Sequence, residues 1–232
     1  IKYFSRTEIA IWSVSVVLIV LSYLLFKSGE ILTLAASLIG VTSLILNAKG
    51  NPLGQVLVII FSLLYGIISF TFAYYGEMIT YLCMTAPMAV IALISWLRHP
   101  YNGNRSEVEI CCVKRRDYPI IILLTIAVTV AFYFILAALD TANLLPSTIS
   151  VTTSFLAVLL TYKRSPAFAL AYAANDIVLI VLWSIASFSD TSYISVVVCF
   201  LCFLINDIYG YINWRCIQRR QQSGGNAAKV AA

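Results

Sequence analysis

Long apolar runs without a charged residue dominate this chain. Six runs contain no Asp, Glu, Lys or Arg, at residues 9–26, 31–48, 50–76, 78–97, 118–139 and 141–162. Two more, 165–189 and 191–214, are each interrupted by one acid, Asp176 and Asp207. Because about 20 apolar residues in a helix cross the hydrocarbon core of a bilayer, the runs predict eight transmembrane helices and an all-α integral membrane fold.

Composition excludes most soluble enzyme classes. The chain is 61% hydrophobic and 11% charged, whereas soluble domains are about half apolar and roughly a quarter charged. A single histidine, His99, argues against histidine-based triads and multi-histidine metal sites, and the sequence contains no glycine-rich phosphate loop. We therefore expect neither a metal nor another cofactor, and no enzymatic activity.

The basic residues predict the direction of the helices. With eight spans, all but one of the 15 Lys and Arg residues fall on one side, and Lys27 falls on the other. Because cytoplasmic loops collect Lys and Arg, both termini are expected in the cytoplasm. Topology explains the net charge of +5. The short basic cluster at 114–116 lacks interleaved aromatic residues, so we expect no nucleic-acid partner.

A faint internal repeat organises the spans. A shift of 114 residues places Lys49 and Pro52 on Lys163 and Pro166. Each of these pairs belongs to a group of three spans, and the two groups end near Trp96 and Trp214. Repeats of this kind are common in transporters. The expected organisation is an extra N-terminal helix (1–28), a first three-helix repeat (30–98), a cytoplasmic loop (99–117), a linker helix (118–139), a second parallel repeat (145–216) and a flexible cytoplasmic tail (217–232).

Polar residues inside the spans are the candidate ligand contacts, because burying charge in a bilayer is costly. Helical spacing places Tyr172, Asp176 and Trp183 on one face, with Asn175 beside them. Such aromatic, amide and carboxylate groups suit a small ligand with a flat ring and hydroxyls, and a cationic ring would gain from a Trp face. The alternatives are interhelical hydrogen bonding for the amides, structural roles for the acids and interfacial anchoring for Trp183. The candidate set is Gln55, Tyr65, Tyr172, Asn175, Asp176, Trp183, Asn206 and Asp207.

Four segments resemble the PnuC-type family of vitamin transporters: "KGNPLGQVLVIIFSLLYG" from Lys49, "YYGE" from Tyr74, "YKRSPAFALAYAANDIVLIVLW" from Tyr162 and "INDIYGYINW" from Ile205. The resemblance covers most of residues 30–216. It implies a 3+1+3 fold like that of the SWEET sugar carriers, a homotrimer in the bacterial cytoplasmic (inner) membrane, and facilitated diffusion of nicotinamide riboside that cytoplasmic phosphorylation makes directional. It also favours Trp183 and Asn206 as substrate contacts, with Gln55 and Tyr65 as partners from the first repeat.

Other functions stay open at this point. Many relatives have a Trp-rich start to the seventh span, whereas this chain reads Phe168-Ala-Leu-Ala-Tyr172, so thiamine or riboflavin are alternative substrates. Proton coupling through Asp176 or Asp207 is a further alternative. An intramembrane aspartyl protease would need both carboxylates to share a proton, and their positions along the spans predict a stagger that argues against it. A structural or receptor-like protein would not need polar stripes in both repeats.

Overall fold

The described residues form a bundle of eight long apolar helices, each of a length and composition that can cross a membrane. The computed structural model describes residues 3–26, 31–71, 74–141 and 143–230, with side chains as far as residue 224. The predicted number of spans and the all-α membrane fold are confirmed. The domain boundary expected at 28–30 and the side of the bundle occupied by Lys27 lie outside the described residues.

The spans follow one another with short connections. Seven of them are α1 (Arg6–Leu25), α2 (Ile31–Ala48), α3 (Leu53–Thr71), α6 (Tyr118–Ala138), α7 (Leu144–Tyr162), α8 (Ala167–Ser187) and α9 (Ile194–Val230), the last preceded by the short 3-10 helix η2 (Thr191–Tyr193). The fourth span is composite and runs through α4 (Tyr75–Ile79), the π-helix η1 (Thr80–Thr85) and α5 (Ala86–Arg98).

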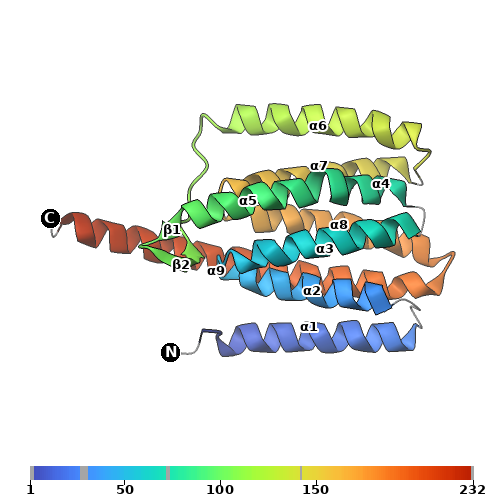
Figure 1. Cartoon of the computed structure of the whole chain (residues 1–232), viewed down its shortest axis with the longest axis horizontal. Coiled ribbons are helices and arrows are strands. Elements are labelled where there is room, and N and C mark those ends of the chain that lie inside the picture. The colour runs from blue at the N-terminus through green and yellow to red at the C-terminus, as the bar shows by residue number, and fades with distance from the viewer. Residues whose placement is uncertain (1–2, 27–30, 72–73, 142, 231–232) are drawn as a thin grey trace.

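The helices lie side by side, with α1 at one edge of the bundle and α6 at the other (Figure 1). Both chain termini lie at the same end, as an even number of spans requires. We call this the basic end, because it carries Lys49, Arg98, Lys163, Arg164 and Arg215, and we call the other the opposite end.

A π-helical turn interrupts the fourth span. The backbone N–H of Ala86 bonds to the carbonyl of Tyr81, five residues earlier. Pro87, in the first turn of α5, has no N–H to continue a regular α-helical ladder from the preceding turn. The widened turn carries Tyr81 and Thr85, both buried, and such turns are frequent at functional sites.

The segment expected as a loop at 99–117 contains a small hairpin. Strand β1 (Pro100–Tyr101) pairs antiparallel with β2 (Asn104–Val108) around Asn102 and Gly103, both of which have positive φ. This hairpin contacts the extension of α9. Gln221 accepts a hydrogen bond from the backbone of Ile110 (2.8 Å) and donates one to the carbonyl of Val108 (3.1 Å).

The tail expected to be flexible from residue 217 is different in the structure. Helix α9 continues to Val230, and Gln218 and Gln221 are buried beneath the hairpin segment. An ion pair between Arg220 and Glu107 adds to these contacts. The sequence here is polar, so the contacts with the hairpin explain why the helix persists. The periodicity of the chain does not predict this hairpin.

Helix α1 is held to the bundle at its start. Ser5 and Glu8 form a reciprocal capping box. The same Glu8 carboxylate is 2% exposed, contacts the Lys49 ammonium at 3.2 Å and accepts a hydrogen bond from the Tyr209 hydroxyl at 3.1 Å. Further along α1, Ser15 accepts a bond from the Asn206 amide (3.0 Å). These contacts join the extra N-terminal helix to α9 and to the end of α2.

Close contact between α2 and α3 depends on Gly54. A Cβ atom at this position would lie 2.7 Å from the backbone nitrogen of Asn47, so Gly54→Ala forces the two helices apart and disturbs the hydrogen bond from Gln55 to Asn47 (2.9 Å). We expect this substitution to lower stability by about 1–3 kcal/mol, as overpacking does. Thermal unfolding of the detergent-purified protein measures the effect.

Gly210→Ala is the matched control, because a Cβ there would meet its nearest neighbour, the Ala48 Cβ, at an ordinary 3.8 Å. Equal unfolding temperatures for the two variants would contradict the close packing of α2 against α3.

Candidate functional site

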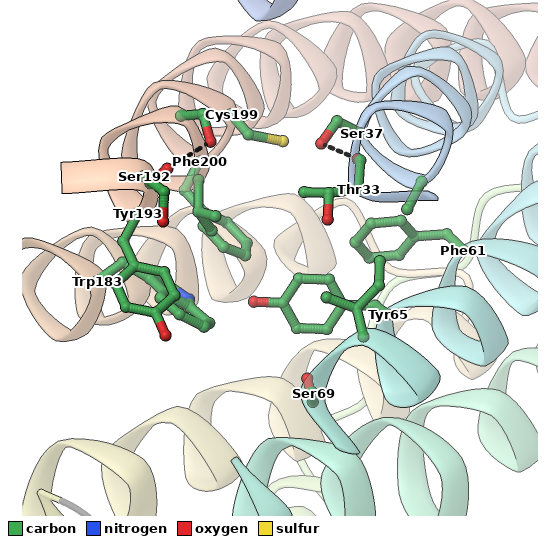
Figure 2. Close-up of a pocket in the computed structure, with 14 residues that line it drawn as sticks. Thr33, Ser37, Phe61, Tyr65, Ser69, Trp183, Ser192, Tyr193, Cys199 and Phe200 are labelled. Atoms are coloured by element: carbon green, nitrogen blue, oxygen red, sulfur yellow. Dashed lines mark hydrogen bonds between the residues drawn. The ribbon is translucent and has the colours of Figure 1, made fainter. Parts of the chain in front are cut away.

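An outer cavity lies near the opposite end, among α2, α3, α8, η2 and α9. Its volume is about 120 Å³. Figure 2 shows the Tyr65 hydroxyl pointing across it toward the side occupied by Trp183 and Tyr193, with Ser69 below. The lining residues are Thr33, Ala36, Ser37, Phe61, Tyr65, Ile68, Ser69, Trp183, Ser192, Tyr193, Ser195, Val196, Cys199 and Phe200.

Three buried polar atoms of this cavity make no hydrogen bond of normal length: the Tyr65 hydroxyl, the Ser69 hydroxyl and the Trp183 indole N–H. The Tyr65 and Trp183 groups face each other across the cavity (Figure 2). Buried groups of this kind are nearly always satisfied in native proteins, because leaving one unpaired costs about 1–3 kcal/mol. Together they offer donors from both repeats to whatever occupies the cavity. Their orphaned state points to a polar ligand.

Aromatic rings surround Trp183. The ring of Tyr74 lies 4.9 Å from its centroid and that of Tyr193 lies 5.3 Å away. Tyr193 is positioned by the turn before it, where the Asp190 carboxylate accepts a hydrogen bond from the Ser192 backbone (2.8 Å). This bond lowers the pKa of the Asp190 side chain below its usual value. The result is a flat-sided enclosure suited to a ring-shaped ligand.

An inner cavity of about 60 Å³ lies deeper, toward the basic end. It is lined by residues of both repeats, including Asn47 of α2 and Tyr172, Asn175 and Asp176 of α8, with Asp207 of α9. Asp176 and Asp207 both line this small cavity, and their carboxyl groups are close enough to interact electrostatically. The stagger expected from the sequence is therefore wrong, because α8 and α9 pack along their length and bring both acids to one depth.

Asn175 is held by its neighbours on α7. Its side-chain oxygen accepts hydrogen bonds from Ser150 (3.2 Å), Thr153 (2.9 Å) and Ser154 (3.0 Å). The amide oxygen therefore joins α7 to α8, which agrees with the alternative of interhelical hydrogen bonding for this amide. The side chain still borders the inner cavity.

An aromatic cluster separates the two cavities. Phe61 and Phe200 line both of them. Ring centroids lie 5.5 Å apart between Phe61 and Tyr65, 4.5 Å between Tyr65 and Tyr81, and 5.6 Å between Phe200 and Phe203. Each cavity is smaller than a usual small-molecule site of about 300–1,000 Å³. A ligand that moves from one cavity to the other must therefore displace these rings.

Two tryptophans lie together at the basic end, one from each of the two predicted repeats. Trp214 donates its indole N–H to the carbonyl of Asn47 (2.7 Å), and Trp96 donates to the carbonyl of Thr161 (3.0 Å). Asn47 and Thr161 are 114 residues apart in the sequence. The two indole rings contact each other at 5.4 Å, and both are fully buried. We call this reciprocal arrangement the tryptophan clasp.

The neighbouring positions repeat the exchange. Asn213 donates to the carbonyl of Ala48 (2.7 Å), and Ser95 donates to that of Tyr162 (3.1 Å). These four acceptors are carbonyls at the ends of α2 and α7, where the regular helical ladder stops. The Asn47 and Thr161 carbonyls each also accept a backbone hydrogen bond of 2.9 Å, from Gly50 and Arg164. Each predicted repeat therefore supplies additional side-chain donors to a helix end of the other.

The hairpin segment adds a second bridge between the repeats. Helices α2 and α7 are followed by residues with positive φ, Gly50 and Arg164. The backbone of Val108 donates to the carbonyl of Gly50, and that of Cys111 donates to the carbonyl of Arg164, both at 3.0 Å. The segment thus spans the two equivalent turns.

Six of the eight predicted site residues line a cavity. Tyr65 and Trp183 border the outer one, and Tyr172, Asn175, Asp176 and Asp207 border the inner one. Gln55 and Asn206 line neither of these two. Gln55 donates to the Asn47 side chain, and Asn206 faces α1, where it donates to Ser15 and to the carbonyl of Cys202 (2.8 Å).

The sequence reasoning missed Glu77. The charge-free runs 50–76 and 78–97 leave Glu77 between two spans, whereas the structure buries it in α4 at 3% exposure with its Oε2 atom unpartnered. The signal was available, since Glu77 is the only charge between Lys49 and Arg98. No group of three or more His, Cys, Asp or Glu side chains that could hold a metal occurs in the described part of the chain.

The chain is similar to known proteins in both sequence and fold. The family model described as nicotinamide mononucleotide transporter matches residues 30–216. A curated relative, a nicotinamide riboside transporter PnuC from Neisseria mucosa, is 26% identical over 91% of this chain and 82% of its own length. A crystal structure described as the vitamin B3 transporter PnuC superimposes with a TM-score of 0.82 at 22% identity, covering 94% of each chain. That structural likeness supports the fold.

The tryptophan clasp generates a stability prediction. Trp214→Phe keeps an aromatic ring but removes one donor to the Asn47 carbonyl, which retains its bond from the Gly50 backbone, and it leaves space around a fully buried side chain. We expect a loss of about 1–3 kcal/mol in thermal or denaturant unfolding. Trp12→Phe is the control, because the Trp12 indole donates to Thr42 (3.2 Å) in an exposed contact. If both variants unfold like the wild type, the clasp does not hold the basic end.

Proposed function

Because the chain belongs to the nicotinamide mononucleotide transporter family, a family of membrane transporters rather than enzymes, we propose that it takes up nicotinamide riboside. Transport occurs by facilitated diffusion, and phosphorylation by a cytoplasmic kinase traps the nucleoside. The observation that carries this proposal is the set of unpartnered buried groups of Tyr65, Ser69 and Trp183, which lie in series with a carboxyl pair. The relative from Neisseria mucosa, named for the same substrate, supports it.

The chemistry of the cavities suits this substrate. Nicotinamide riboside has a flat pyridinium ring with a fixed positive charge and a ribose with hydroxyls. The ring stacks among Trp183, Tyr65 and Tyr193, where a cation gains on the order of 0.5–2 kcal/mol from an aromatic face. The ribose and carboxamide pair with the orphaned hydroxyls, and the Asp176 and Asp207 carboxyls offset the charge in the inner cavity.

The substrate contacts that we propose are the cavity-lining members of the predicted set: Tyr65, Tyr172, Asn175, Asp176, Trp183 and Asp207. Gln55 acts one step away, by positioning Asn47 at the wall of the inner cavity. Asn206 joins α9 to α1. The geometry therefore favours Trp183 over Asn206 as a ligand contact.

Transport requires the two repeats to move relative to each other about this central site. The basic end is the cytoplasmic side in this proposal, with both termini there, since Lys and Arg collect on that face. Release into the cytoplasm then requires the tryptophan clasp to separate. The protein resides in the bacterial cytoplasmic (inner) membrane as a homotrimer, as the family resemblance implies.

Calorimetric titration tests the substrate. Detergent-purified protein is titrated with nicotinamide riboside, thiamine and riboflavin under identical conditions, and we expect a saturable isotherm for nicotinamide riboside. Trp183→Phe and Tyr65→Phe each remove one orphaned polar group while keeping a ring, so each weakens binding by about tenfold. Asn206→Ala is the matched comparison and leaves affinity unchanged. A response to thiamine alone would move this chain to a thiamine-carrying role with the same fold.

The carboxyl pair generates a second prediction. The reduced dihydro form of nicotinamide riboside has nearly the same shape but no ring charge. We expect the wild type to prefer the cationic form, and Asp176→Asn or Asp207→Asn to narrow this preference by about tenfold, because a buried charge interaction is lost. Asp140→Asn, which changes an exposed acid that lines neither cavity, keeps the preference. If the ratio of the two affinities is the same in all variants, the carboxyls do not recognise charge.

A further inference from the structure

A groove at the basic end is separate from both cavities. It has a volume of about 430 Å³ and lies where the start of α6, the end of α7, the start of α8 and the middle of α9 meet. Its walls are mostly apolar, with Leu156, Leu160 and Leu170 from α7 and α8, and Ile121 and Ile122 from α6. Leu170 and Ile122 are 46% and 56% exposed, so the apolar wall opens to the surface that faces the bilayer.

The mouth of the groove is polar and basic. Arg215, Gln218 and Ser165 border it, together with the aromatic side chains of Tyr118 and Tyr211. Tyrosines of this kind are typical of the interface between hydrocarbon and water. The groove therefore runs from the apolar depth of the membrane to the level of the lipid headgroups.

The charges at this mouth are not neutralised. The Arg215 guanidinium donates to the Gln218 side-chain oxygen (3.0 Å), and among the described residues it has no acidic partner within 4.0 Å. The adjoining segment contributes Lys114, Arg115 and Arg116, which are exposed and equally without an ion pair in that part of the chain. The acid that follows them, Asp117, contacts Lys163 at 3.7 Å.

We propose that this groove binds one anionic phospholipid of the leaflet at the basic end. Its phosphate lies beside the Arg215 guanidinium at the mouth of the groove, and one acyl chain lies along Leu156, Leu170 and Ile122. Basic pockets between the cytoplasmic ends of transmembrane helices suit such headgroups. A soluble anion would use the charges but not the apolar wall, and a neutral lipid would use the wall but leave the charges unpaired.

Lipid-dependent thermal stability tests the proposal. The purified protein in detergent is supplemented with dioleoyl phosphatidylglycerol, with dioleoyl phosphatidylcholine, or with inorganic phosphate at equal concentration. We expect phosphatidylglycerol to raise the unfolding temperature by roughly 5 °C, because a ligand that binds the folded state stabilises it. Native mass spectrometry should retain one phosphatidylglycerol per chain under the same conditions.

Two variants separate charge from shape. Arg215→Gln removes the cation, and Leu170→Trp fills the apolar wall at an exposed position; each should lose most of the shift and the retained lipid. Arg219→Gln is the matched control, because it removes an exposed cation one turn away on the same helix that does not line the groove. Equal stabilisation by phosphatidylcholine or by inorganic phosphate would overturn the proposal, as would equal losses in Arg215→Gln and Arg219→Gln. The experiment does not involve the vitamin, so it stands apart from the proposed transport function.

Discussion

The reciprocal contacts of Trp96 and Trp214 hold the two repeats together at one end, and the rest of the site depends on them. Helices that end inside a protein leave carbonyls without partners, and in a chain this apolar few side chains can serve them. Here the two indoles add donors across the predicted repeats, at the Asn47 and Thr161 carbonyls, which otherwise accept only from the turn after their own helix. Any motion that opens the basic end must give up these hydrogen bonds, and water then has to replace them.

The two cavities follow one another from the tryptophan clasp toward the opposite end. Phe168 lines the inner cavity and packs its ring 4.7 Å from that of Trp214, so the clasp forms the floor beneath the carboxyl pair. The aromatic cluster around Phe61 forms the next partition, and the outer cavity lies beyond it. The polar groups are thus divided between two compartments that aromatic rings keep separate. A cationic substrate that crosses the protein would meet a donor-lined compartment first and an acidic one second.

Much of this arrangement is predictable from the sequence. Charge-free runs locate the helices because a bilayer tolerates few charges, and the spacing of Tyr172, Asp176 and Trp183 correctly places them on an inward face. The depth of a residue in the bundle and the rotation of its helix are harder to predict. Asn206 and Asp207 are neighbours on α9, and because consecutive helical residues do not share a face, one faces α1 and the other the inner cavity. No spacing within α9 shows which face α1 will cover.

Features that depend on contacts distant in the sequence are missed for a similar reason. The approach of Asp176 to Asp207 follows from the packing of two whole helices, and the helical extension past residue 217 follows from a hairpin more than 100 residues earlier. The 114-residue repeat is predicted from a few matching residues at the ends of the spans. The paired hydrogen-bond acceptors at Asn47 and Thr161 now support that interpretation from independent contacts.

Uptake of labelled nicotinamide riboside into proteoliposomes tests the central claim of uncoupled transport most directly. The membrane potential is clamped at zero, because a cationic substrate responds to voltage in any case, and uptake is followed with and without an imposed proton gradient. The account predicts saturable uptake that stops at equal concentrations inside and outside and has the same rate in both conditions. Acceleration or accumulation driven by the proton gradient would contradict it and would assign proton coupling to the Asp176 and Asp207 pair.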